Sequence, residues 1–205
     1  MQTDLNTLTV IEAAEARRSI RTFQDRPVPA EDLREILRVT SLAPSAFNVQ
    51  PWRFVVVEDA ETRARLQEAA FNQKQVGGAP AVIVLYSDIR DAVDTLEEVV
   101  HPNYPAEQRP AVADGFRKSF STKTPQEQEA FGVGQSYIAL GYLLLAAQSL
   151  GYSTSPMLGF DPARVREILG LPEHVAIPAL VALGVGAEEG FTHHRHDVER
   201  IATFR

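Results

Sequence analysis

The chain has 205 residues, contains no cysteine and carries 27 acidic against 20 basic residues, for a net charge of −7. This composition excludes disulfides, thiolate metal sites and cysteine nucleophiles, and the negative charge argues against nucleic acid or an anionic membrane as a partner. We therefore expect a cytoplasmic globular protein of one large domain or two small ones, in which any anion site is a local cluster.

Neither a leader peptide nor a membrane span is expected. The first twenty residues carry acidic side chains and lack the long apolar core of a signal peptide. The longest apolar run covers residues 137–147, which is too short to cross a bilayer.

Helix and strand patterns alternate in the first part of the chain. Residues 8–17 predict a helix with an apolar face, and a second helix begins just after Pro29, a favourable first-turn residue, and ends before Pro44. Residues 53–58 are β-branched and aromatic, which predicts a strand.

The pattern weakens in the middle of the chain. Asp59 caps a third helix that runs to about residue 71, and residues 81–86 predict a strand apolar enough to be central. Between residues 87 and 123, only two short helices, at 92–100 and 110–120, are predicted, and prolines interrupt them. We interpret 87–123 as an insertion or lid and expect it to be the most mobile part.

A capping box opens a long helix over residues 124–150. Because its apolar run has no polar interruption, we expect this helix to be buried on nearly all sides. A further helix at 161–170, a third strand at 175–185 and a polar tail at 190–205 complete the chain. Few strands among many helices predict an α+β fold, with a small sheet wrapped by helices.

Three arginines and a serine stand close together directly after the first predicted helix, as Arg17, Arg18, Ser19 and Arg21. Arginine forks can bond two phosphate oxygens at once, so this stretch is a candidate anion site. The alternative is a solvated helix end whose basic residues complement the helix dipole.

Several familiar sites are absent or disfavoured. No phosphate loop occurs, and no Gly-x-Gly-x-x-Gly follows a strand. His193, His194 and His196 suggest a metal cluster, but adjacent histidines in an extended chain point to opposite faces, and no acidic partner stands at helical spacing. We expect a solvated tail or an anion contact there, and no metal.

Four stretches in order resemble the flavin-dependent nitroreductase family. They are Arg-Arg-Ser-Ile-Arg at 17–21, Ala-Pro-Ser-x-x-Asn-x-Gln-Pro-Trp at 43–52, Ser-Pro-Met-Leu-Gly-Phe at 155–160, read as a turn, and Gly-Val-Gly at 184–186. The resemblance runs from about residue 12 to residue 195 and leaves the insertion uncovered. It implies one nitroreductase-like domain over residues 1–205, with a small, mixed but mostly antiparallel sheet.

The resemblance also implies an FMN-binding homodimer with two sites at the subunit interface, using NADPH or NADH as co-substrate. Arg17, Arg18 and Ser19 would contact the FMN phosphate and ribityl chain, and Arg195 would complete that site. Arg21 would approach the pyrimidine edge. The other implied contacts are Asn72, Pro156, Met157, Leu158, Gly159 and His193 of the same chain, and Pro44, Ser45, Ala46, Asn48 and Gln50 of the other chain.

The flavin would carry the chemistry without a catalytic side chain, in a ping-pong cycle that ends on a nitroaromatic, quinone or related acceptor. Two alternatives stay open: a family member with a dedicated substrate, through reductive dehalogenation, aldehyde or enone reduction or oxidative flavin chemistry, and a flavin-binding protein without turnover. Ala46-Phe47 stands where many relatives carry small hydroxyl residues, and Gln75 and His193 stand where lysine is common. The aromatic residues Phe116, Phe120 and Phe131 could line the acceptor pocket or belong to the core. Trp52 is interpreted as a packing residue.

Overall fold

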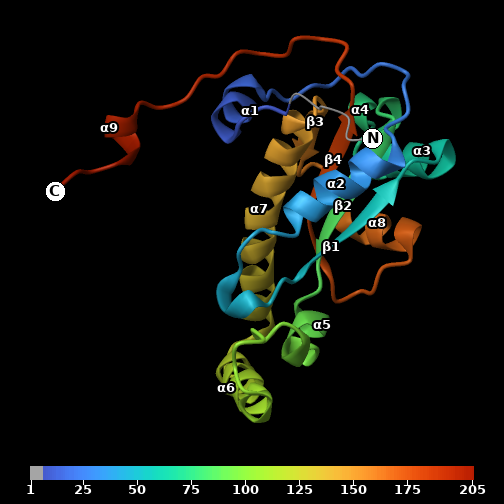
Figure 1. Cartoon of the computed structure of the whole chain (residues 1–205). Coiled ribbons are helices and arrows are strands. Elements are labelled where there is room, and N and C mark those ends of the chain that lie inside the picture. Colours follow the sequence, from blue (N-terminus) through green and yellow to red (C-terminus); the bar gives the residue numbers. More distant parts are fainter. Residues whose placement is uncertain (1–6) are drawn as a thin grey trace.

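The computed structural model describes residues 7–205, so residues 1–6 of the predicted domain lie outside the described residues. Its centre is a four-stranded sheet in the order β1-β2-β4-β3, in which every neighbouring pair is antiparallel (Figure 1). The strands are β1 (Trp52–Val57), β2 (Ala81–Ser87), β3 (Ser153–Met157) and β4 (Ala176–Gly184). The predicted α+β class, a small sheet wrapped by helices, is confirmed.

Helices surround the sheet and occupy most of the positions that the sequence predicts. They are α1 (Val10–Ala16), α2 (Ala30–Thr40), α3 (Ala60–Ala69), α4 (Lys74–Gly78), α5 (Ile89–Asp94), α6 (Arg109–Phe120), α7 (Pro125–Ser149), α8 (Pro162–Leu169) and α9 (Val198–Ile201). The predicted capping box of the long helix is present: the Thr124 side chain accepts from the Glu127 amide, and the Glu127 side chain accepts from the Thr124 amide.

Alternating side chains of the two central strands fill two cores. Ile83 of β2 and Val181 of β4 face a core under α2 and α7, whereas Val84 and Leu180 face a core under α3, α4 and α8. Successive residues of a strand point to opposite faces, so an unbroken apolar strand is buried on both sides. The prediction that residues 81–86 form a central strand is confirmed.

The Ser-Pro-Met stretch was predicted to be a turn, and this prediction is wrong for its first part, which forms strand β3. The strand is short, polar and contains Pro156, so it lacks the usual composition of a strand. Among the described strands it pairs only with β4, at the end of the strand order, and proline is tolerated in such an edge strand.

Helix α7 is not buried on nearly all sides, so that expectation was wrong. It packs against α1, α2 and all four strands, yet it leaves a stripe of exposed residues at helical spacing. Tyr137, Ile138 and Tyr142 on this stripe are about two-fifths exposed, at 43%, 39% and 39%. An unbroken apolar run therefore covers both a core face and a face that residues 7–205 leave exposed.

The same helix is long and apolar enough to cross a membrane by length and composition alone, although its apolar run was predicted to be too short for this. The prediction considered only residues 137–147, whereas the whole helix has 25 residues. Because α7 packs along the sheet, it is the central helix of this fold.

The insertion between residues 87 and 123 forms a small core of its own, at the lower end of the molecule in Figure 1. Phe116 and Phe120 of α6 pack there with Leu96 and with Val49, which precedes β1. The predicted helix at 92–100 is instead α5 and a 3₁₀ turn (Leu96–Glu98), because the Asp88 side chain caps the chain earlier by accepting from the Asp91 amide. That this region is the most mobile stays a prediction.

Candidate functional site

The arginine stretch follows α1 and is held beside the edge of the sheet. Helix α1 ends because Arg17 has a ψ of 128°, outside the helical range. Ser19 then forms a parallel bridge with Thr154 of β3, and the Ile20 amide donates to the Thr154 carbonyl oxygen over 3.1 Å. This pairing directs the predicted phosphate-binding residues toward the C-terminal end of β4 and the tail that follows it.

The stretch and the tail enclose one cavity of about 180 Å³. His193 Nε2 lies 2.7 Å from the carbonyl oxygen of Arg17 and 3.0 Å from Arg18 Nη1. The cavity is lined by Arg17, Arg18, Ser19, Arg21, Phe191, Thr192, His193 and Arg195. The structure thus brings together the four residues predicted for the phosphate and ribityl chain, Arg17, Arg18, Ser19 and Arg195, and with them His193 and Arg21, although Arg21 was predicted for the pyrimidine edge. Phe191 and Thr192 also line the cavity and were missed, although they directly precede His193.

The charges in this cavity are uncompensated. Among the residues that the structure describes, Arg17 Nη1 is buried without a hydrogen-bond partner. The pKa of Arg17 is lowered first by burial and then by the positive charges of Arg195 and Arg18. No ion pair within residues 7–205 involves any of these three arginines. A buried donor that lacks a partner costs free energy, so the arrangement suits a bound anion such as a phosphate.

A second group of predicted residues lies between α3 and the end of β3. Asn72 stands in the loop after α3, where Gln73 Nε2 donates to the Gly159 carbonyl oxygen over 2.6 Å. Gln75 is buried, and its Nε2 lies 3.2 Å from Met157 Sδ. The loop therefore meets Pro156 and Met157 at the end of β3 and Leu158 and Gly159 just after it, of which Leu158 is exposed. Gln73 and Gln75 were not predicted as its supports, because only the folded chain brings 73 and 159 together.

The predicted stretch from Pro44 to Gln50 lies elsewhere on this chain. The Ala46 amide donates to Gln135 Oε1 over 2.8 Å, near the middle of α7, whereas the chain before α1 is bonded to Ser149 at the C-terminal end of the helix. Fourteen residues of helix separate the two positions, which is roughly 20 Å along its axis. One chain therefore does not bring Asn48 to the arginine cluster.

Backbone strain coincides with two of these loops. The five non-glycine residues with positive φ among residues 7–205 are Phe47, Asn48, Gln50, Phe71 and Asn72. A left-handed conformation costs roughly 1–2 kcal/mol per residue, and such residues concentrate at functional sites. Three of the five were predicted as site residues on other grounds.

An apolar cavity of about 330 Å³ lies between this loop and the insertion. Its lining includes Asn48, Val99, His101 and Phe116, and the Phe47 ring covers Phe116 with a centroid distance of 4.5 Å. Phe116 both lines the cavity and belongs to the small core, while Phe120 and Phe131 pack only within that core. Trp52 is buried in the main core, as predicted.

The three histidines of the tail do not share one environment. All three are exposed, and His193 in addition contacts the arginine stretch. Within residues 7–205, no group of three or more histidine, aspartate or glutamate side chains is arranged to hold a metal ion.

Comparison with known proteins identifies the same family that the four sequence motifs resemble. A model of the nitroreductase family matches residues 14–186. The chain belongs to the nitroreductase family. A protein named NADH dehydrogenase from Thermus thermophilus is 51% identical over the full length of both chains, and YdgI of Bacillus subtilis, provisionally named an NAD(P)H nitroreductase, is 31% identical over 98% of this chain and 100% of its own. The predicted family and the enzyme class, oxidoreductase, are confirmed.

Comparison with solved structures shows that the chain has the nitroreductase fold. The crystal structure of a provisionally assigned nitroreductase from Exiguobacterium sibiricum in complex with FMN superposes with a TM-score of 0.88 at 27% identity. It covers 98% of this chain and 99% of its own.

Proposed function

We propose that the protein is an FMN-dependent NAD(P)H oxidoreductase that passes hydride to a nitroaromatic, quinone or related small acceptor in a ping-pong order. The observation that carries this proposal is the cation cluster around Arg17. Within the described part of the chain, one buried guanidinium nitrogen of this cluster has no hydrogen-bond partner, and the adjacent arginines form no ion pair. A phosphate group of FMN would supply the missing acceptor and the missing negative charge. The FMN complex of the Exiguobacterium relative supports the same cofactor.

In this proposal the same chain provides most of the cofactor contacts. Arg17, Arg18, Ser19, His193 and Arg195 hold the phosphate and ribityl chain. Arg21 and Asn72 serve the polar edge of the ring, where positive charge stabilises the reduced state. Pro156 to Gly159 cover one face of the ring, and a backbone N–H of Leu158 or Gly159 faces the flavin N5 atom.

When bound, FMN accepts and donates hydride at N5, so the protein needs neither a nucleophile nor a metal. The residues of the chain contribute proximity and orientation by stacking first the nicotinamide and then the acceptor over one flavin face.

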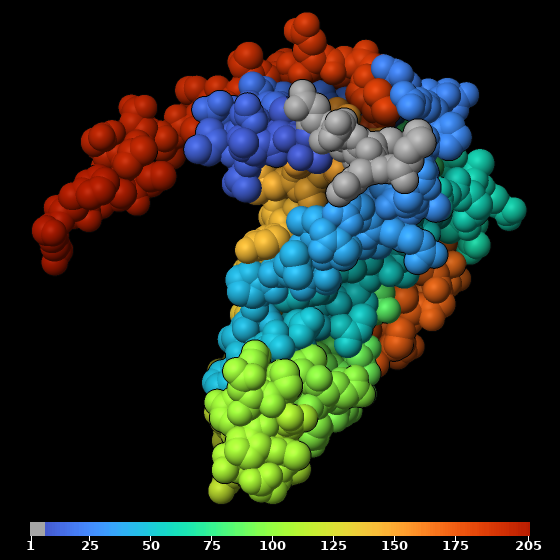
Figure 2. All heavy atoms as spheres, viewed as in Figure 1, coloured from blue at the N-terminus to red at the C-terminus, as the bar shows by residue number. Residues whose placement is uncertain are grey.

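The remaining contacts, Pro44, Ser45, Ala46, Asn48 and Gln50, are proposed to come from a second copy. The separation of fourteen helical residues described above supports this assignment, because these residues lie too far from the arginine cluster of their own chain. The exposed stripe of α7 and the apolar residues of the tail support a homodimer as well. Figures 1 and 2 show the tail leaving the body as an arm, and its Val198, Ile201 and Phe204 are exposed.

An anaerobic titration tests this function. The purified protein, reconstituted with FMN, is mixed with NADH or NADPH while the visible spectrum is recorded. Bleaching of the flavin by either nucleotide is expected. A flavin that binds but resists both nucleotides would favour a binding role without turnover, and failure to bind FMN would overturn the proposal.

The physiological acceptor and the cytoplasmic location remain parts of the proposal. A dedicated substrate within the same family is the second candidate, and the apolar cavity beside Asn48 favours an uncharged acceptor. A screen of nitro compounds, quinones, enones, aldehydes and halogenated aromatics, with product analysis, separates these possibilities.

A further inference from the structure

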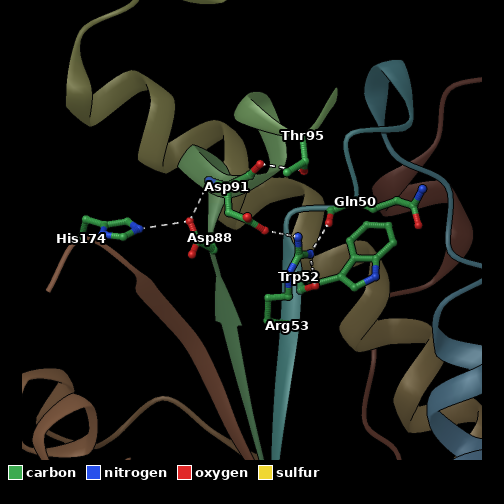
Figure 3. Close-up of polar contacts among 7 residues, drawn as sticks. All are labelled: Gln50, Trp52, Arg53, Asp88, Asp91, Thr95 and His174. Atoms are coloured by element: carbon green, nitrogen blue, oxygen red, sulfur yellow. Dashed lines mark hydrogen bonds and ion pairs between the residues drawn. The ribbon is translucent and has the colours of Figure 1, made fainter. Parts of the chain in front are cut away.

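Arg53 ties the loop that ends at Gln50 to the start of helix α5 (Figure 3). Its Nη1 donates to the carbonyl oxygens of Gln50 and Trp52 over 2.8 and 2.9 Å. Its Nη2 donates to Asp91 Oδ2 over 2.6 Å. One guanidinium therefore joins two carbonyl oxygens of the loop and strand entry to a carboxylate of a different element, which suits the planar fork of arginine.

Asp91 is itself fixed from two sides. Its amide donates to Asp88 Oδ1 over 3.0 Å, and its carbonyl oxygen accepts from Thr95 Oγ1 over 2.8 Å. Asp88 is held in turn, because its amide donates to the Pro51 carbonyl oxygen over 2.8 Å and its Oδ1 lies 3.1 Å from His174 Nε2. The network runs from the loop before β4, through the N-terminal end of α5, to the last residues of the Pro44–Gln50 loop.

The backbone of the loop held by this network is in a strained conformation. Phe47, Asn48 and Gln50 have φ values of 56°, 59° and 43°, each in the left-handed region. Such residues persist only where surrounding contacts fix them. Inside the loop, the Gln50 amide donates to Ser45 Oγ over 3.0 Å and Gln50 Nε2 donates to Asn48 Oδ1 over 3.1 Å, so fixing Gln50 also fixes Asn48 and Ser45.

We propose that Arg53, anchored by Asp91, is a positioning residue that holds the Pro44–Gln50 loop in its strained, cofactor-ready conformation. The proposal rests on the function proposed above, in which this loop contacts the FMN of the partner subunit. Arg53 need not touch the flavin: it acts through the Gln50 carbonyl oxygen, and through Gln50 on the side chains of Ser45 and Asn48.

The test uses Arg53→Met in the full chain, with two readouts. The dissociation constant for FMN, measured by flavin fluorescence, is expected to weaken about tenfold, equivalent to about 1.4 kcal/mol. Turnover at saturating FMN is expected to stay within about twofold of the parent, because the positioned loop is restored once cofactor is bound. Amide exchange at Asn48, Val49 and Gln50 in the apoprotein is expected to accelerate about tenfold.

Companion variants separate positioning from folding. Arg53→Lys keeps the charge but not the planar fork, so it is expected to lie between the parent and Arg53→Met in both readouts. Asp91→Asn removes the anchor and is expected to shift both in the same direction. Arg38→Met is the matched control, since Arg38 also donates two bonds to one carboxylate, that of Glu35, on the exposed side of α2.

The outcomes distinguish this proposal from the proposed function. If Arg53→Met folds and leaves both FMN affinity and loop exchange unchanged, or if Arg38→Met reproduces its effects, Arg53 does not position the loop. If the parent protein binds no FMN, the proposed function fails, while faster exchange of the loop amides in Arg53→Met still establishes the structural role of Arg53. A general loss of melting temperature and of exchange protection throughout the chain would also overturn the specific role.

Discussion

His193 Nε2 lies 2.7 Å from the carbonyl oxygen of Arg17, which joins the base of the C-terminal tail to the end of the first helix. The two residues are 176 positions apart in the sequence. This contact closes the cation cavity, because Arg195 follows two residues later and adds its charge to those of Arg17 and Arg18. The tail is therefore part of the candidate site as well as the proposed dimer arm.

Replacing Arg17 by methionine should have opposite effects on cofactor binding and on the apoprotein. Affinity for FMN should fall at least about tenfold, because a charge-assisted bond to phosphate is worth roughly 1.5–3 kcal/mol. The melting temperature of the apoprotein should stay the same or rise, since Arg17 is held near two other positive charges with its pKa lowered. Fluorescence titration and thermal unfolding measure the two effects, and a large loss of apoprotein stability would contradict the anion-site assignment.

Introducing a charge on the exposed stripe of α7 should dissociate the proposed dimer. Ile138→Glu places a carboxylate where the described chain leaves an apolar side chain 39% exposed. Burying that charge in a subunit interface is costly, so light scattering should report a monomer with weakened FMN binding. Glu129→Gln, at an exposed position nearer the start of the same helix, serves as the control. A fully dimeric Ile138→Glu protein would place the interface elsewhere.

The insertion should loosen in acid because of one ion pair. Arg117 donates to the Glu97 carboxylate and lowers the pKa of Glu97 from its ordinary value of 4.5 to about 2. A depressed carboxylate pKa means that this stabilisation is present above about pH 4.5 and is lost as the pH falls toward 2. Amide exchange across residues 96–117 should accelerate over that window in the parent protein, and the Glu97→Gln variant should lack the Glu97 part of the change.

Much of the fold follows from local patterns in the sequence. Capping residues mark the starts of α3, α7 and α8, and the alternation of β2 between two cores explains its unbroken apolar composition. Strand β3 was missed because its identity as a strand comes from its neighbour β4 and not from its own residues. The exposed stripe of α7 was missed for a similar reason: an apolar run does not say whether its partner belongs to the same chain.

The candidate site was predictable to the extent that its residues are adjacent in sequence. Arg17, Arg18 and Ser19 stand together, and the structure adds the tail that the family resemblance implied. Three supporting residues gave no local signal, because their partners are brought close only by folding. Gln73 and Gln75 support Gly159 and Met157 at the end of β3, and Arg53 supports Gln50. The contacts of the 44–50 stretch with a flavin remain predictions.

The central claim is that Arg17 of one chain and Asn48 of another serve the same flavin. Arg17→Ala and Asn48→Ala chains, each carrying a different affinity tag, are co-expressed, and the doubly tagged heterodimer is isolated and compared with both parent homodimers. Because the heterodimer contains one site with both residues intact, about half of the unaltered flavin content and NAD(P)H-dependent bleaching should return. A stable heterodimer with no more bound flavin and no more bleaching than the two single variants would contradict a site built from two chains.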